Sequence, residues 1–242
     1  MSQQVRVERE LVYDNQADVD INIKGNPDTK RMVVVDEFWY DSQANYTVTL
    51  DGTSDAVAAT VGGTSGLTLT TGTADNEISF IGTGLIFDIT QKPVIEIRVS
   101  LTDVSGTVFF FGFSDANTET SPAGSIDADG GTVTAVATDA AGILVDADLG
   151  ASSIYSVSVN TGGTAQSQDS ALDWADGVEY VLRVALDASG NVRTYVNGVE
   201  EGYLASAVAD VPLCAVINFG TRANDGSNTV MLRSLKMWQD HA

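Results

Sequence analysis

The sequence contains one cysteine and one histidine in 242 residues. A single cysteine excludes a disulfide framework within the chain and any zinc site with several cysteine ligands. Cys214 lies in the apolar run 212–219, so we expect a buried thiol that packs as a small hydrophobe. His241 is the penultimate residue, where chain ends usually fray. Without another histidine to act as a base, most Ser-His and Cys-His mechanisms are excluded.

Basic residues are also scarce. Lys and Arg number 12 against 33 Asp and Glu, which gives a net charge of −21. So acidic a surface repels phosphates and anionic headgroups, and we expect neither nucleic acid nor membrane as a partner. No apolar run is long enough to span a bilayer, and the first ten residues lack the apolar stretch of a secretory signal. We therefore expect synthesis in a cytoplasm.

Residues that favour helices are few, whereas Val, Thr, Ile, Gly, Ser and Asp dominate, as in strands joined by tight turns. Period-two alternation recurs, for example over 46–50, 95–101 and 181–186. Turn signals such as Asn197-Gly198 separate roughly a dozen short strands about ten residues apart. The pattern predicts an all-β sandwich or barrel.

The first 31 residues form a separate segment in this prediction, and residues 32–242 form a single domain. The segment holds five of the twelve basic residues and is the place where the sequence concentrates cations: Arg6, Arg9, Lys24, Lys30 and Arg31. We predict an N-terminal arm whose cations contact an acidic neighbour, such as another copy of the chain. The simpler interpretation is a first strand followed by a loop.

Several stretches resemble the concanavalin A-like, or laminin G-like, jelly roll. Residues 33–40 resemble an entry strand, 93–101 a strand of the concave sheet, and 107–115 its antiparallel partner, in which Gly112 allows close approach between two phenylalanines. Residues 179–199 resemble the strand–turn–strand meander ending in Tyr195-Val-Asn-Gly198, and 228–238 the closing strand beside the first. The resemblance covers about residues 32–240 and implies an antiparallel jelly-roll sandwich.

Acidic one-domain versions of this fold with a polar arm are similar to virion proteins of tailed bacteriophages. This resemblance implies a capsid decoration or head-fibre protein located in the virion. It would be a homo-oligomer that contacts the major capsid protein or other virion proteins and stabilises the shell. The small-residue-rich stretch 114–178 fits weak strands, an insertion, or a surface facing another subunit.

Glucanases of this fold class carry Glu-x-Asp-x-x-Glu on one strand, which brings two carboxylates onto the same face. The corresponding strand here starts at Glu96 and has no second or third acid. Asp146 and Asp148 offer another carboxylate pair, but acidic turns in so negative a chain are more often solvated surface. We therefore predict that the protein is not an enzyme.

No cofactor is expected, with Ca²⁺ as the candidate exception. Asp127 and Asp129 share the spacing that opens a calcium loop, and residues 115–119 are also rich in oxygen ligands. No Glu follows at the twelfth position, and Asp-Gly pairs form turns without any ion. The turn interpretation is therefore preferred.

A carbohydrate-binding module contacting a host surface is the alternative function. Sugar binding needs an exposed aromatic ring beside polar groups, and the candidates are Trp39, Tyr40, Trp174 and Tyr203. Trp174 and Tyr203 are the preferred glycan platform because Trp174 precedes the meander in a turn. A core position for Trp174 is the competing and favoured interpretation, since buried aromatics dominate sandwich energetics.

Overall fold

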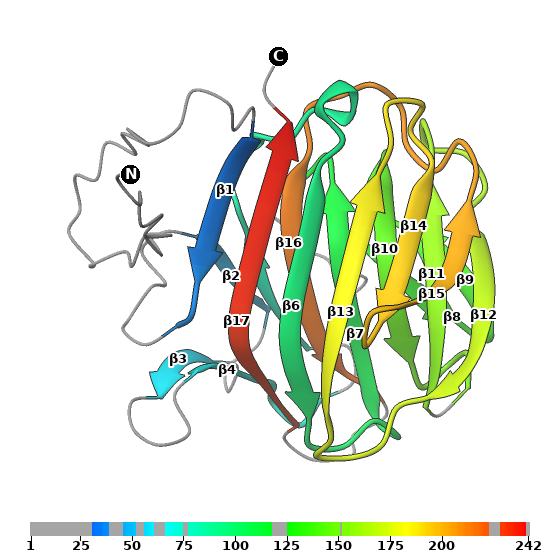
Figure 1. The fold of residues 1–242 in the computed structure, drawn as a ribbon. Helices are drawn as coiled ribbons and strands as arrows, with labels where there is room; N and C mark the ends of the chain where they lie inside the picture. The colour runs from blue at the N-terminus through cyan, green and yellow to red at the C-terminus, as the bar shows by residue number, and fades with distance from the viewer. Residues whose placement is uncertain are drawn as a thin grey trace, which may run out of the picture.

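A computed structural model describes residues 31–38, 46–51, 56–60, 66–74, 77–117, 125–150, 152–222 and 228–240. These residues form two large antiparallel sheets and one short hairpin, and none of them lies in an α-helix (Figure 1). The all-β class predicted from the alternation is confirmed.

Sheet A contains both the first and the last strand of the described chain. Its spatial order is β15 (Val199–Leu204), β14 (Val192–Val196), β13 (Glu179–Leu186), β6 (Val94–Leu101), β17 (Thr229–Asp240), β4 (Gly66–Thr70) and β3 (Ala56–Thr60), with β1 (Arg31–Asp36) also beside β17. Because β1 pairs with β17 from Arg31↔Asp240 to Asp36↔Leu235, the predicted closing strand does return beside the first.

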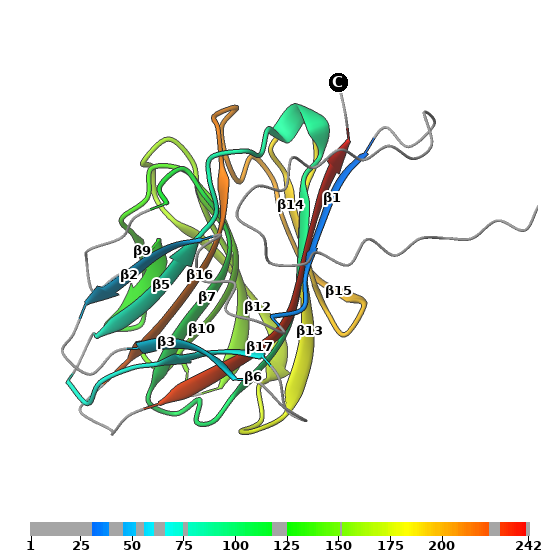
Figure 2. The same ribbon diagram turned by 90° about the vertical axis from the view of Figure 1, so that its left-hand side faces the viewer.

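Sheet B packs against sheet A as a second layer, which is seen edge-on in Figure 2. Its order is β12 (Gln166–Asp173), β11 (Ser153–Val159), β10 (Ala140–Asp146), β7 (Thr107–Ser114), β16 (Cys214–Thr221), β5 (Ile78–Gly82) and β2 (Thr47–Asp51). The remaining hairpin joins β8 (Ile126–Asp129) to β9 (Thr132–Ala135). Within the described residues a 3-10 turn, η2 (Ile89–Gln91), precedes β6.

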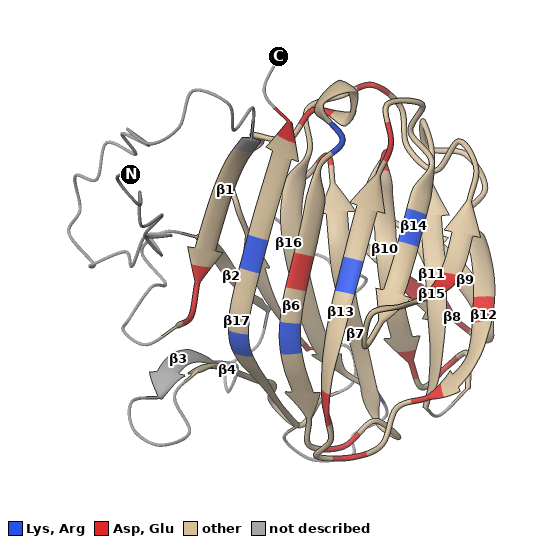
Figure 3. Cartoon of the chain, viewed as in Figure 1, with Lys and Arg blue, Asp and Glu red and all other residues tan. Residues whose placement is uncertain are grey.

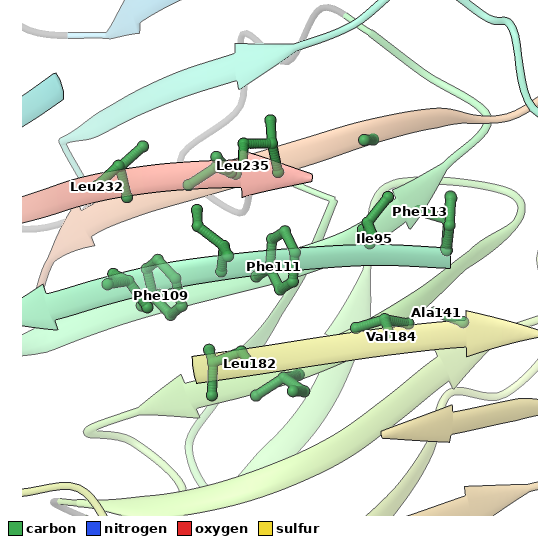
Figure 4. Packing of buried hydrophobic residues seen from close by; sticks show 14 of the residues in the cluster. Ile95, Phe109, Phe111, Phe113, Ala141, Leu182, Val184, Leu232 and Leu235 are labelled. Atoms are coloured by element: carbon green, nitrogen blue, oxygen red, sulfur yellow. The ribbon is translucent and has the colours of Figure 1, made fainter. Parts of the chain in front are cut away.

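The main core lies between the two sheets and follows from the alternation along each strand. Inward residues come from β6, β13 and β17 on one side and from β7 and β10 on the other, as Figure 4 shows. Phe109, Phe111 and Phe113 of β7 are all buried in this layer. Each such ring stabilises the fold by about 1.5–3 kcal/mol on burial, so β7 is a central strand of the core.

The meander predicted at 179–199 is confirmed. β13, β14 and β15 follow one another in sheet A, with Asp187 and Asn191 closing the first turn. Asn197 (φ 52°) and Gly198 (φ 84°) form the second turn. Positive φ at both central residues suits the right-handed twist of a two-residue hairpin, which explains the Asn-Gly pair.

One predicted pairing is wrong. Residues 107–115 were expected beside 93–101, but β6 lies in sheet A, whereas β7 lies in sheet B between β10 and β16. The chain therefore crosses between the sheets after Leu101. The described residues of the stretch 114–178 form five strands, of which β10 and β11 lie inside sheet B and are not an appended insertion.

Gly112 also has a different role from the predicted one. It pairs with Gly142 of β10 on the outer face of sheet B. A Cβ at Gly112 would lie 2.8 Å from Cζ of Phe110 and 2.3 Å from the carbonyl oxygen of Ala141. The glycines thus make room for the ring of Phe110, which lies over them outside the sandwich.

A second apolar layer covers this outer face of sheet B. Its buried residues include Phe80, Phe110, Leu144 and Val216 from the sheet and Ile126 from the β8–β9 hairpin. In Figure 2 the hairpin lies on the side of sheet B that faces away from sheet A. Cys214 belongs to this layer and is fully buried, as predicted.

Candidate functional site: the outer face of sheet A

The outer face of sheet A is charged where the outer face of sheet B is apolar. Outward positions fall into transverse rows set by the strand register. One row runs Lys236–Glu96–Arg183–Tyr195 across β17, β6, β13 and β14. The next row joins Trp238 of β17 to residues of β6, β13 and β14, and it ends with Arg193 beside Tyr203.

Arg183 occupies the centre of this face. Its Nε donates to Oε2 of Glu96 at 2.8 Å. Its guanidinium carbon lies 5.7 Å from the ring centroids of both Tyr195 and Trp238. A planar guanidinium between two rings and a carboxylate is held in place by cation–π and charge-assisted contacts.

Two further arginine clusters flank it. Glu179 accepts hydrogen bonds from Arg98 through Oε1 and lies 3.1 Å from Nε of Arg233 through Oε2. Arg193 donates from Nη1 to Oε1 of Glu200 at 2.7 Å.

The ring of Tyr203 belongs to the second of these clusters. The guanidinium carbon of Arg193 lies 4.7 Å from the Tyr203 centroid. Burial and the neighbouring Glu200 together raise the pKa of nearby Tyr195, so its phenol stays neutral at physiological pH.

We call the five cations of this surface the cationic face: Arg98, Arg183, Arg193, Arg233 and Lys236. They lie on β6, β13, β14 and β17, the strands of sheet A that are nearest the viewer in Figure 3, where Lys and Arg positions are blue. Three carboxylates, Glu96, Glu179 and Glu200, neutralise three of the five charges, and Lys236 has no ion-pair partner among the described residues. Asp240, the next outward residue of β17 after Trp238, adds a fourth carboxylate, so the face carries a surplus of 5 − 4 = 1 positive charge on a chain of net charge −21.

The N-terminal arm is therefore not the one place where cations concentrate. Residues 1–31 hold five basic but also six acidic residues, which gives 5 − 6 = −1. Arg6, Arg9, Lys24 and Lys30 lie outside the described residues. Arg31 begins β1, and its side chain is not described. Contact of the arm with a partner stays a prediction. In the sequence, these residues alternate with inward apolar positions, which marks each one as outward-facing on its own strand but does not show that the strands are neighbours.

Of the two residues of the predicted glycan platform, the structure buries Trp174 and exposes Tyr203. Trp174 is 2% exposed and packs edge-on to Phe109, with ring centroids 5.8 Å apart, and also contacts Tyr180. This position agrees with the core interpretation and corrects its use as an exposed platform. Tyr203 is 42% exposed, but Arg193 covers part of its ring. Trp39 and Tyr40 lie outside the described residues.

The predicted calcium pair is also separated. Asp129 is exposed at the end of β8, whereas Asp127 points into a buried ion cluster. Arg222 donates from Nη2 to Oδ2 of Asp127 at 3.0 Å and to Oδ2 of Asp146 at 2.7 Å. Thr134 donates to the other oxygen of Asp127. The guanidinium therefore occupies the position that a metal ion would need.

Burial dominates the electrostatics of this cluster. It raises the pKa of Asp127 and of Asp146, although hydrogen bonds from Arg222 oppose the rise. Asp146 accepts in addition from the backbone N–H groups of Ala128 and Asp148. The cluster thus fastens the β8–β9 hairpin to the end of β10. Across the described stretches, no three His, Cys, Asp or Glu side chains are grouped as metal ligands.

The strand expected to carry glucanase acids is β6, and there Glu96 is paired with Arg183. The outward positions next to Glu96 on β6 are Val94 and Arg98, so the strand offers no second carboxylate on that face. Among the buried side chains without a hydrogen-bond partner is that of Asn218 of β16, which is 2% exposed and whose side-chain oxygen and nitrogen both lack one.

Within the described ranges no helix is long and apolar enough to cross a membrane.

No family model and no curated protein matches the sequence. Solved structures do match. A glycoside hydrolase family 16 endo-glucanase from Bacteroides ovatus is 12% identical with a TM-score of 0.58, covering 84% of this chain and 99% of that one.

The carbohydrate recognition domain of Emp47p is likewise 12% identical, with a TM-score of 0.56 and coverage of 82% and 89%. A sialidase matches at 13% identity and a TM-score of 0.56 over 85% of this chain, which spans only 18% of the sialidase's length. At these identities the likeness concerns the fold. The chain has the concanavalin A-like jelly-roll fold found in lectins and glycoside hydrolases.

Proposed function

We propose that this protein is a non-enzymatic binding domain that holds protein subunits together, as a capsid decoration or head-fibre protein of a tailed phage does. The observation that carries the proposal is the cationic face. Five of the seven cations whose side chains are described gather on one sheet face of this acidic chain, and two of them, Arg183 and Arg193, lie against aromatic rings. Arginine and aromatic residues are the types enriched at the centres of protein interfaces.

The arrangement fits a protein partner better than a small substrate. The strands of this face lie side by side in one continuous sheet, and its carboxylates are engaged by arginines. A hydrolytic pair would need two carboxylates about 5–9.5 Å apart with one free to donate a proton. Glu96, Glu179 and Glu200 are each engaged as acceptors in an ion pair with an arginine.

Location in a virion rests on the sequence resemblance. The test is to add the purified chain to capsid shells assembled without it and to separate shells from free protein on a density gradient. We expect saturable binding with a fixed number of copies per shell, and a higher temperature of shell disruption. A folded chain that stays at the top of the gradient at every concentration would refute the structural role.

Glycan recognition is the second candidate, favoured by the exposed edge of Tyr203 beside Arg193. The carbohydrate recognition domain among the structural matches adds to it. A glycan array with the wild-type chain and Tyr203→Ala tests it. Val199, on the same strand and 59% exposed, gives the control Val199→Ala. Binding lost only with Tyr203→Ala supports recognition at this ring, and an array without any signal excludes this candidate.

A further inference from the structure

Outside the cationic face, almost all exposed charged side chains among the described residues are acidic. Of the other cations whose side chains the structure describes, Arg222 is 6% exposed within its ion cluster, and only Lys92 is exposed. Exposed acids by contrast lie on β12, in turns and at strand ends, as Figure 3 shows. Each molecule therefore carries both a cationic face and the anionic surface that would complement it.

We propose, on the basis of the proposed function, that the cationic face docks on the acidic surface of a second copy of this chain. Charge complementarity selects the geometry of this contact. An isologous dimer through the face would place the cations of two copies against each other. A head-to-tail contact places the face of one copy on the acidic side of the next, and such heterologous contacts build rings or open assemblies.

The face is prepared for such a contact before a partner arrives. Arg183 is fixed by Glu96, Tyr195 and Trp238, and Arg193 by Glu200 and Tyr203. Side chains that are already ordered lose less conformational entropy on binding. Lys236 adds an exposed charge in the same row as Arg183.

The cationic face also has an exposed apolar residue at its margin, which suits a contact with another protein. Val33 of β1 lies opposite Trp238 in the register and is 43% exposed. An apolar margin beside fixed arginines and tyrosines resembles the composition of interface cores, where aromatic residues and Arg are enriched and Lys is depleted.

The dependence of association on salt concentration distinguishes this contact from non-specific association. Two chains of net charge −21 repel each other, so non-specific association strengthens when salt screens the repulsion. A contact between the cationic face and an acidic surface weakens instead. Screening shortens the Debye length from about 8 Å at 0.15 M salt to about 3 Å at 1 M.

The experiment is sedimentation velocity of the full chain over a concentration series at both salt concentrations. We expect oligomers at 0.15 M salt that dissociate at 1 M. Lys236→Glu should weaken association at least about tenfold, since a like charge then faces the acidic partner. Lys92→Glu makes the same change in net charge outside the strands that carry the face and should shift the association constant less than about twofold.

A chain that stays monomeric at 0.15 M salt, or equal effects of the two substitutions, would overturn the proposal. A second measurement, binding to capsid shells, separates a failure of this proposal from a failure of the proposed function. If the chain is monomeric but still adds to capsid shells, the subunit-binding role stands and the second-copy contact does not. If Lys236→Glu abolishes shell binding while the chain is monomeric, the face docks on the shell.

Discussion

Removal of the buried cation Arg222 tests how the second apolar layer is held. We take Arg222→Met, which keeps a long side chain but deletes the guanidinium. In the native chain this group donates to Asp127, Asp146 and the carbonyl of Ala128. The substitution leaves two carboxylates buried without their cation, and Asp146 is fully inaccessible.

The expected loss is large because desolvated charges without a partner are costly. Breaking one partner of a buried ion pair destabilises a protein by about 3–5 kcal/mol. For a domain of this size each kcal/mol corresponds to about 2–4 °C in melting temperature, so the midpoint should fall by about 6–20 °C. Asp148 supplies the control. Its exposed carboxylate lies 3.9 Å from Nε of Arg222, and Asp148→Asn should cost less than about 1 kcal/mol.

The pH dependence gives a second signature. Burial raises the pKa of Asp127 and Asp146 in the folded chain. A folded pKa above the unfolded value means that stability rises as pH falls through the folded pKa. In the native chain, hydrogen bonds and charge from Arg222 act to lower the pKa of Asp127 and Asp146. Arg222→Met removes this effect, so both pKa values should rise further. The deficit of the variant should therefore shrink between about pH 7.5 and pH 4.5.

Thermal denaturation followed by circular dichroism at these two pH values measures both effects. Amide hydrogen exchange over residues 126–135 locates them, since the β8–β9 hairpin should lose protection first. A loss below about 1 kcal/mol, or a deficit that grows on acidification, would contradict the account of the cluster as a buried clamp.

Three other substitutions test the layers and turns. Trp174→Ala should cost about 3–5 kcal/mol in urea denaturation, and Trp174→Phe clearly less, because the indole N–H has no hydrogen-bond partner to lose. Gly112→Ala places a Cβ 2.3 Å from a carbonyl oxygen and should strongly reduce the yield of folded protein, whereas Gly84→Ala, with 3.5 Å of space, should not. Burial acts to raise the pKa of Asp187, but hydrogen bonds led by Asn191 lower it overall, so Asp187 stabilises the fold above the unfolded pKa of about 3.9 and this contribution is lost as pH falls through the folded pKa. Acid titration of Asp187→Ala should accordingly show a smaller loss of stability below about pH 4 than the wild type.

Local patterns predicted the local parts of the fold. The meander from Glu179 to Leu204 is a run of adjacent strands, and its Asn-Gly turn fixes the register within a few residues. The burial of Cys214 followed from its apolar neighbours in the same way. The pairing of β7 was missed because two consecutive strands in a sandwich lie either side by side or in opposite sheets, and alternation reads the same in both cases.

The candidate site depends on long-range register and was therefore missed. Arg98, Arg183 and Lys236 come from three distant strands, and only the pairing of β6 with both β13 and β17 places them in neighbouring rows. The cluster of basic residues near the N-terminus was visible in the sequence. The prediction of a cationic arm counted these residues without the acidic residues between them. The burial of Arg222 could not be inferred either, because its partners lie 76 and 95 residues away.

The two outer faces of the sandwich impose different constraints on function. On the outer face of sheet B lies an internal apolar layer, in which Phe110 and Leu144 are buried together with Ile126 of the β8–β9 hairpin. A ligand reaching that face would have to displace the hairpin and break the ion cluster of Arg222. Sheet A carries no such layer within the described residues, and its outward arginines are already held by carboxylates and aromatic rings of the same face. A partner that binds the sandwich broadside therefore meets the cationic face first, and a contact there requires no rearrangement of the fold.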